Sequence, residues 1–554
     1  MKNVQLHSQL SDNRRIKGTS LQFLLLYILA LILLMTINSI AAIKTSITSG
    51  NWENASIWVP RGVPTPSDNI IIGRNTVVTT TADQSIESLV LNQDGEMNIG
   101  ISKRLTINSG ISLDGKLNMN KGMLTMNSVG NLFYISPTGT FIWDPGINTS
   151  EEATLFSLCN EQFDIGSTLI VKNWYNYSIP FCQNINGNFG NLEMNSPSSG
   201  NSIVEWNQQN LFESHKIFGT LTIDQGWITL DKSGSITNTT FGNIYLKNVN
   251  STFYGHNGNH PGTFSIHCSN ITNDRGTFYG LNDGNGNVIV QTFGNFSNSG
   301  NVKIINNTGV IGVSNGNATL SIEGSYSQTS GDCRIIYNIA STNSGTFNAR
   351  FGNLILDGGI FMGQTACHTG NQQSILRVNN EFRINFRNPG DKFRGTSLSS
   401  ISGISNNMKL NLIIGGNFKI EGNVNSEVTS SASAGQETVS INGNMEVSGC
   451  TTSLNYGAPS SSHDNQLNIA GNLIMNGGEL SLSKNSGLFS GSISNKLLIN
   501  GGILAIKNAN GSSTFTVSRG LIQSGGNFIF HHNISNPTSD NIIVSINLKI
   551  TTND

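Results

Sequence analysis

The feature that most constrains the fold of this chain is a short segment that recurs at a nearly constant spacing. The tripeptide Phe-Gly-Asn opens an alternating apolar segment four times, with spacings of 52, 52 and 58 residues, at Phe189, Phe241, Phe293 and Phe351. Towards the C-terminus, related segments follow one another after 27 to 30 residues, at Gly415, Asn442, Ala470 and Asn500. Such a period is typical of a solenoid, in which each repeat forms one coil.

Within one period the apolar residues alternate over very short stretches. Residues 104–127 contain four apolar pairs, and Gly, Asn or Asp follows each pair within a few residues. Alternation indicates strands with one buried face, and these turn residues tolerate the positive φ of tight corners. We predict an all-β, right-handed parallel β-helix of about 16 to 19 coils, with a β-sandwich array as the alternative.

Composition agrees with an ordered β protein and argues against some partners. Charged residues make up 12% of the chain, about half the usual share, and the net charge is −2. This balance gives no electrostatic reason to expect nucleic acid. The β-branched and aromatic residues in the alternating runs argue against disorder.

Residues 1–41 have the pattern of an export signal. Basic residues precede a mostly apolar run over residues 21–37, and Ser39 and Ala41 are the small residues that a signal peptidase requires. We expect cleavage after Ala41 or Ala42 and an extracellular or cell-surface protein. The alternative is an uncleaved anchor, because the apolar run nearly spans a bilayer, and this would be the only membrane contact.

Two tryptophans stand close together immediately after this segment, in residues 42–103. A β-helix ends in an open edge and an apolar bore that must be covered. Trp52 and Trp58 are large enough to plug the bore, and the prolines at 60, 64 and 66 blunt edge pairing by withholding donors. We therefore predict an N-terminal cap and first coils over residues 42–103, with β-helix repeats over residues 104–554.

The N-terminal sequence motif resembles the opening of large secreted β-helix repeat proteins on the surface of gliding Gram-negative bacteria. It reads Trp52-x5-Trp58-x3-Gly62-Val63-Pro64-x3-Asp68-Asn69-x-Ile71. It is also similar to the start of the eight-glycine domain of some extracellular β-helix proteins. Segments such as "GTFIWDP" and "STLIVKNWYNY" resemble their recurring units. The resemblance implies export by type IX secretion and a C-terminal sorting domain. This chain ends in "NIIVSINLKITTND" with no recognisable sorting domain, so we expect it to be truncated.

The most basic stretch, residues 377–395, is the candidate binding site. Its cations are Arg377, Arg383, Arg387, Lys392 and Arg394. In a chain so poor in charge, this group is suited to bind an acidic polysaccharide. The alternative interpretation is a solvated strand face balanced by Glu381 and Asp391.

Other candidate sites have weaker patterns. His256, His260, His267 and Cys268 have spacings that suit zinc only if four ligands converge, and residues 281–287 lack the Gly and Glu of a calcium loop. We expect no metal and no cofactor. Aromatic residues at 174, 175 and 177 are suited either to sugar stacking or to packing.

Cysteine spacing suggests one possible disulfide bond. Cys159 and Cys182 lie 23 residues apart, about one coil, so they would stack on neighbouring rungs within disulfide reach. Free buried thiols are the alternative.

We interpret the chain as a secreted or cell-surface structural or adhesive β-helix whose partner is an extracellular polysaccharide or a neighbouring cell surface. Many β-helices cleave polysaccharides, so a lyase or hydrolase is the alternative function. We do not expect an enzyme, because acidic residues are scattered singly and no cluster recurs at coil spacing.

Overall fold

The structure is a computed structural model that describes most of the repeat region. The described residues are 23–28, 41–127, 130–144, 159–173, 190–195, 203–205, 217–231, 238–258, 262–282, 286–307, 316–338, 345–365, 373–397, 408–422, 426–427, 435–449, 451–453, 464–483, 488–507, 512–531 and 542–546. Strands dominate these residues and pair almost entirely in parallel, so the chain is an all-β parallel solenoid, as predicted. The right hand of the coil stays a prediction.

One ladder of parallel pairings, here called the spine, joins nineteen strands along the stack. In chain order these are β2 (Gly50–Asn51), β5 (Val77–Thr79), β7 (Glu96–Asn98), β9 (Lys116–Asn118), β12 (Thr140–Trp143), β14 (Thr168–Lys172), β15 (Asn191–Asn195), β17 (Ile217–Asp231), β18 (Asn238–Leu246), β20 (Thr263–Asn273), β23 (Phe296–Asn298), β25 (Ala318–Gln328), β27 (Phe347–Leu356), β30 (Phe382–Phe386), β33 (Phe418–Gly422), β36 (Met445–Ser448), β39 (Leu473–Met475), β42 (Leu497–Ile499) and β45 (Leu521–Gln523). Its pairing does not break at residue 104, because β7 pairs with β9.

The other strands complete the coils around the bore. The N-terminal coils use β1 (Ile43–Ser46), β3 (Trp58–Val59), β4 (Asn69–Ile72), β6 (Gln84–Leu91), β8 (Arg104–Leu113), β10 (Met123–Met126), β11 (Asn131–Ile135) and β13 (Cys159–Phe163). In the later coils the corresponding strands pair with each other or with the first halves of long spine strands. They are β22 (Asn287–Thr292), β29 (Gln373–Val378), β32 (Met408–Ile414), β35 (Gly435–Ile441), β38 (Asp464–Ile469), β41 (Phe489–Ile493), β44 (Ser513–Val517) and β47 (Ile542–Ile546).

A third face, here called sheet C, carries the site discussed below. It consists of the second half of β17 together with β16 (Ile203–Glu205), β19 (Ser251–Asn257), β21 (Thr277–Asn282), β24 (Asn301–Asn307), β26 (Asp332–Asn338), β28 (Ile360–Thr365) and β31 (Lys392–Ser397). A five-stranded sheet follows, made of β34 (Ser426–Glu427), β37 (Thr451–Ser453), β40 (Glu479–Ser481), β43 (Ile503–Lys507) and β46 (Asn527–His531).

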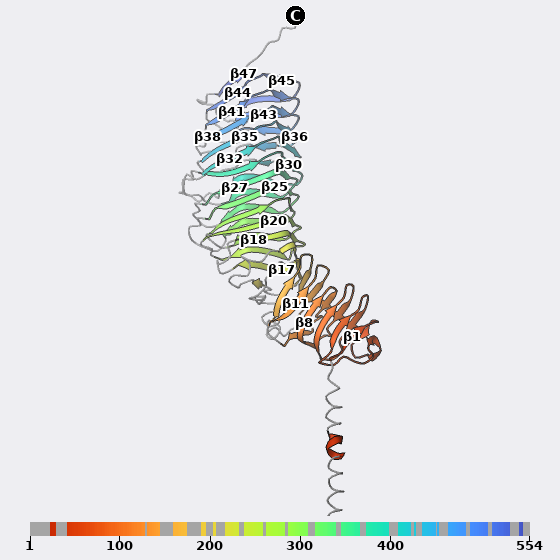
Figure 1. The fold of residues 1–554 in the computed structure, drawn as a ribbon. Helices are drawn as coiled ribbons and strands as arrows, with labels where there is room; N and C mark the ends of the chain where they lie inside the picture. The colour runs from red at the N-terminus through yellow and green to blue at the C-terminus, as the bar shows by residue number, and fades with distance from the viewer. Residues whose placement is uncertain are drawn as a thin grey trace, which may run out of the picture.

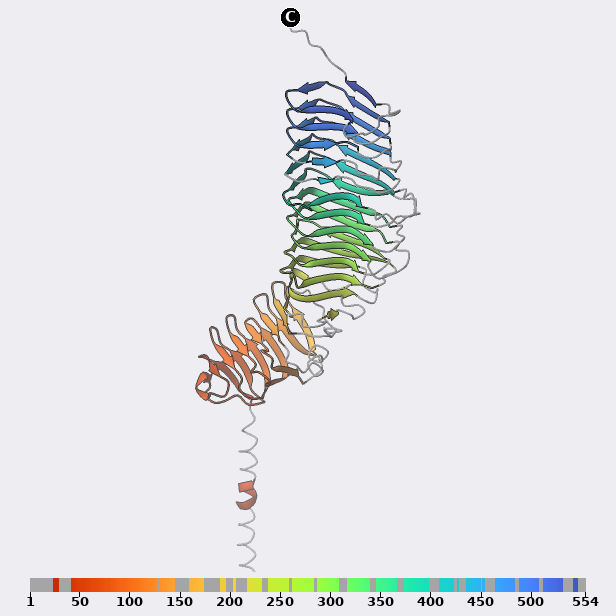
Figure 2. The same ribbon diagram turned by 180° about the vertical axis from the view of Figure 1, so that it is seen from behind.

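The stack changes direction along its length. Figures 1 and 2 show the N-terminal coils, coloured red to orange, set at an angle to the coils that begin near β17. Buried Phe, Leu, Ile and Val side chains fill the interior of both parts. Aromatic rings in the bore stack from coil to coil, as do Phe253 and Phe278, whose ring centroids lie 5.0 Å apart.

The Gly-Asn pair of the repeats has a direct structural reason. The Oδ1 atoms of Asn295, Asn417 and Asn444 accept hydrogen bonds from backbone N–H groups of the next coil at 2.8 to 2.9 Å. The asparagine therefore satisfies a backbone donor at the corner that no strand pairing reaches. The preceding glycine allows close stacking, because a Cβ on Gly443 would meet the Gly416 carbonyl oxygen at 2.5 Å.

The segment around the two tryptophans lies at the N-terminal end of the stack. β3 pairs antiparallel with β1 and so occupies the outer edge of that sheet, beside the short 3-10 helix η1 (Ala55–Ile57). Trp52 and Trp58 are fully buried and meet edge to face at 4.9 Å between ring centroids. The Trp58 Nε1–H donates to the Trp52 carbonyl oxygen at 2.9 Å, so the indole polar atom is satisfied.

Glu53, beside Trp52, ties this segment to the next coil. Its carboxylate accepts hydrogen bonds from the backbone N–H groups of Thr81 and Ala82 and from the side chains of Thr81 and Gln84, at 2.8 to 3.1 Å. Burial raises the pKa of Glu53, but these hydrogen bonds outweigh it and hold the pKa below its ordinary value.

We expect the contribution of Glu53 to stability to depend on pH. A lowered pKa in the folded state means that the charged carboxylate stabilises the fold above the unfolded-state pKa, and that this stabilisation is lost as pH falls through the folded-state pKa. Glu53→Gln should therefore destabilise the N-terminal coils more at pH 7 than at about pH 3. Unfolding followed by tryptophan fluorescence measures the difference, and an equal effect at both pH values would contradict the role of the charge.

Of the predicted export segment, the structure describes a helix over residues 23–28 with exposed side chains. Among all described residues, no helix has the length and apolar character needed to cross a bilayer.

Candidate functional site

The structure distributes the five predicted cations over different faces of the solenoid. Arg377 lies on β29, and Arg383 lies on the spine strand β30. Arg387 follows β30 and is exposed, whereas Lys392 and Arg394 lie on β31 in sheet C. The stretch is contiguous in sequence, but its strands belong to two sheets. β29 and β30 both pair with β27, whereas β31 pairs with β28 in sheet C.

Arg383 has a carboxylate partner from the previous coil. Its guanidinium donates to both oxygens of Asp357 at 3.0 and 3.1 Å, and both side chains are about one-third exposed. The acids predicted to balance this stretch have other partners. Glu381 lies 3.5 Å from the ammonium group of Lys419, and buried Asp391 accepts from the backbone N–H groups of Gly359 and Asn388.

The outward face of sheet C carries a row of aromatic and cationic side chains that sequence reasoning did not identify as a site. We call it the tyrosine–cation strip, and it consists of Trp227, Tyr254, Tyr279, Lys303, Arg334 and Tyr337. The register places Tyr254 opposite Tyr279, Tyr279 opposite Lys303, and Lys303 opposite Arg334 on successive rungs. The repeated segment Thr-Phe-Tyr-Gly at residues 252 and 277 was the available sequence signal. Aligning the coils on it puts both tyrosines on one face.

The rings of this strip lie in ordered contact. Tyr254 and Tyr279 stack with centroids 4.9 Å apart and planes 7° from parallel, and Trp227 meets Tyr254 edge to face at 6.1 Å. The Lys303 ammonium lies 4.2 Å from the Tyr337 ring centroid, and the Arg334 guanidinium lies 4.6 Å from it. All of these side chains are half-buried, so each presents part of its surface outward. Cation–π contacts of this kind hold the cations over the rings.

The strip is cationic towards the C-terminal side. Outward positions that the structure describes on β24, β26, β28 and β31 carry four cations, namely Lys303, Arg334, Lys392 and Arg394, and one carboxylate, Asp332. Asp332 accepts from Arg334 Nε at 2.8 Å and holds its guanidinium in place. The face therefore offers the edges and hydroxyl groups of tyrosine rings beside an excess of positive charge, which suits a sugar polymer that carries acidic groups.

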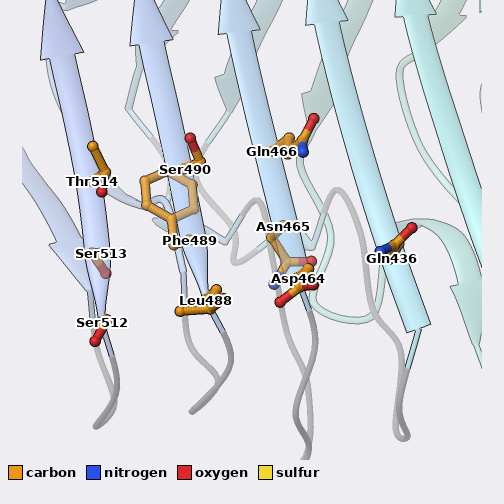
Figure 3. A pocket seen from close by; sticks show the side chains of 10 residues that line it. All are labelled: Gln436, Asp464, Asn465, Gln466, Leu488, Phe489, Ser490, Ser512, Ser513 and Thr514. Atoms are coloured by element: carbon orange, nitrogen blue, oxygen red, sulfur yellow. The ribbon is translucent and has the colours of Figure 1, made fainter.

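A separate shallow pocket of about 270 Å³ lies near the C-terminal end. Figure 3 shows its lining side chains at the beginnings of four neighbouring strands, β35, β38, β41 and β44. Among the ten lining residues, Asp464 supplies one carboxylate, and the others are amides, hydroxyls, Leu488 and Phe489. Glycoside hydrolysis uses two carboxylates on either side of the scissile bond, and these lining residues do not supply a pair.

The His and Cys residues that were considered as zinc ligands do not come together within the part of the chain that the structure describes. His256 is buried on β19, whereas His267 and Cys268 are neighbours on β20 and so point to opposite faces. His260 lies outside the described residues. No group of three or more His, Cys, Asp or Glu side chains among those described is placed to hold a metal ion.

Several other candidates fall partly or wholly outside the described residues. These include Cys182, the aromatic residues at 174, 175 and 177, and residues 283–285 of the calcium-like loop. The Cys159–Cys182 disulfide therefore stays a prediction. Cys268 and Cys333 are free buried thiols, and burial raises the pKa of each to about 12.

No family model, no curated protein and no solved structure matches this chain.

Proposed function

We propose that this protein is a secreted or cell-surface adhesive solenoid that binds an acidic polysaccharide along sheet C. The observation that carries the proposal is the stacked pair Tyr254 and Tyr279, continued on the same outward column by Lys303 and Arg334. The outward edges and hydroxyl groups of the tyrosines can pack against and hydrogen-bond sugar units, and carboxylate or sulfate groups bind guanidinium and ammonium groups. The strip offers both kinds of contact in sequence along the solenoid axis.

The geometry also suits a long polymer rather than a small molecule. Successive side chains of the strip come from successive rungs, which lie about 4.8 Å apart, so contacts repeat along the direction of the stack. Repeated weak contacts add to a useful affinity when one chain engages them together. The side-chain amides of Asn257, Asn282 and Asn306 form a hydrogen-bonded ladder beside the strip. Asn306 is buried, whereas the half-buried amides of Asn257 and Asn282 can offer further polar contacts to hydroxyl groups.

The N-terminal sequence supports the location part of the proposal. Its basic residues, apolar run and small residues before Ala42 match an export signal. Type IX secretion, as the resemblance implies, would place the solenoid on the cell surface.

A polysaccharide lyase or hydrolase is the alternative function. The solenoid fold is compatible with it, and the pocket at β35–β44 is a place where a short segment of polymer could bind. The observations favour binding, because the aromatic and cation–π contacts of the tyrosine–cation strip lie on an open face and not in that pocket.

The test is binding of the purified chain to polygalacturonate, dextran sulfate and neutral dextran. Tyr254→Ala with Tyr279→Ala should lower affinity for the acidic polymers by roughly thirtyfold, since two aromatic contacts contribute about 1 kcal/mol each and 1.4 kcal/mol is tenfold. Tyr245→Ala is the matched control, because this half-buried tyrosine lies on the spine and not on sheet C. Unchanged binding in the double variant would refute the role of the strip. Release of unsaturated or reducing sugar ends with time would establish the enzymatic alternative.

A further inference from the structure

Arg350 and Arg377 form a pair of like charges on adjacent rungs, away from the strip. Arg350 lies on β27 opposite Arg377 on β29, and both side chains are exposed. Adjacent parallel rungs lie about 4.8 Å apart, so the two guanidinium groups start from neighbouring positions on one face. Like charges placed directly opposite each other destabilise a sheet, so this arrangement has a cost that a bound anion would remove.

Neither arginine of the pair has a carboxylate partner among the described residues. Two other arginines of this region do have one, since Arg334 is paired with Asp332 and Arg383 with Asp357. The same column continues with Ser321 on one side of the pair and Ile413 on the other, neither of which is charged. The positive charge of the pair is therefore not neutralised from within its own column.

The pair also lies at a hollow in the surface. A depression of about 300 Å³ is lined, among the described residues, by Asn348, Arg350, Ile375 and Arg377. This volume is far larger than the roughly 10 to 15 Å³ that one water needs. The lining joins two guanidinium groups, an amide and an aliphatic side chain, which are suitable contacts for an acidic sugar unit.

We infer that Arg350 and Arg377 form an oxyanion site that binds a carboxylate or sulfate group of an acidic polysaccharide. The identity of the polymer rests on the proposed function, whereas the affinity for the oxyanion does not. A guanidinium is planar and presents parallel N–H donors, so two of them on neighbouring rungs can bind the oxygens of one anion with charge-assisted hydrogen bonds. Asn348 is placed to donate to a neighbouring hydroxyl group.

Arginine modification tests the site directly on the full chain. Phenylglyoxal should modify Arg350 and Arg377 faster than the ion-paired Arg334 and Arg383, as mapped by mass spectrometry. Inorganic sulfate should protect the first two and leave the rates of the other two unchanged. Absence of protection, or equal protection of all four, would overturn the inference, whether or not any polysaccharide binds.

Binding of two acidic polymers then shows whether the site binds sulfate or carboxylate groups. Arg350→Gln with Arg377→Gln should lower affinity by about tenfold or more for dextran sulfate, for polygalacturonate or for both, because hydrogen bonds to charged groups are strong. Sensitivity to one polymer alone identifies sulfate or carboxylate as the bound group. Lys replacements at both positions should restore only part of the affinity, since they keep the charge and lose the planar fork.

Arg383→Gln is the matched control and should leave binding nearly unchanged. An equal loss in this control would show that only net charge matters and would overturn the site. The effect of the tyrosine variants on polymer binding is independent of the effect of the arginine variants. If they bind normally while the arginine variants do not, the proposed strip is wrong and the oxyanion site stands.

Discussion

Trp58→Ala is expected to destabilise the N-terminal coils by about 3–5 kcal/mol, the usual cost of truncating a large buried aromatic side chain. Trp58 is fully buried, packs edge to face on Trp52 and donates to its carbonyl oxygen. In a solenoid each coil contacts only its neighbours, so the effect should be local. Hydrogen exchange measured by mass spectrometry should show faster exchange in β1, β4 and β6 and little change in β38 to β45.

Val59→Ala is the matched control for this variant. Val59 is the next residue of β3, and half of its surface is exposed, so its truncation should alter exchange only slightly. If Trp58→Ala exchanged no faster than this control in the first coils, the tryptophan pair would not be the stabilising element at this end.

Phe382→Ala is expected to destabilise the coils in the middle of the stack, again by about 3–5 kcal/mol of local stability. Phe382 has no exposed surface, stacks on Phe418 at 4.6 Å between centroids and meets Phe393 edge to face at 4.9 Å. Removing the ring leaves a cavity between adjacent coils and also loses two aromatic contacts. Because coupling passes between neighbours, chemical denaturation should show the coils around β30 unfolding before the rest.

Arg383→Ala is the control from the adjacent position of the same strand. Its side chain points outward, and its ion pair with Asp357 is about one-third exposed, so its loss should cost only about 0–1 kcal/mol. Equal denaturation midpoints for the two variants would mean that the phenylalanine stack does not hold these coils together.

The fold could largely be predicted from the sequence, because the patterns that indicate strands and turns are local. Alternation over a few residues places Phe382, Ile384 and Phe386 on one side of β30, and all three are buried. The Gly-Asn pairs mark the corners, where asparagine side chains bond the next coil. The bend of the stack between the N-terminal coils and β17 was not predicted, because no repeat spacing marks a change of axis.

The candidate sites were less accessible because they depend on contacts between coils. The basic stretch looked like one cluster in sequence, yet the structure divides it between two sheets. Arg377 and Arg383 lie on β29 and β30, which both pair with β27, whereas Arg394 lies on β31 in sheet C. The strip combines residues such as Tyr254 and Arg334, which are 80 positions apart in the chain. Nothing in either local segment indicates that they share a column.

The sequence by itself determined that this chain coils into a parallel β-solenoid with an aliphatic and aromatic bore. That outcome follows from steric alternation and from turn residues, which act over a few neighbouring positions. Only the tertiary structure decided which charges are neutralised and which are not. Arg383 meets Asp357 from 26 residues away, whereas Arg350 meets Arg377, because the register between coils depends on the varying lengths of the segments that join them. A shift of one residue would turn every side chain to the opposite face, so the partners of each surface charge are set by the stacking of whole coils.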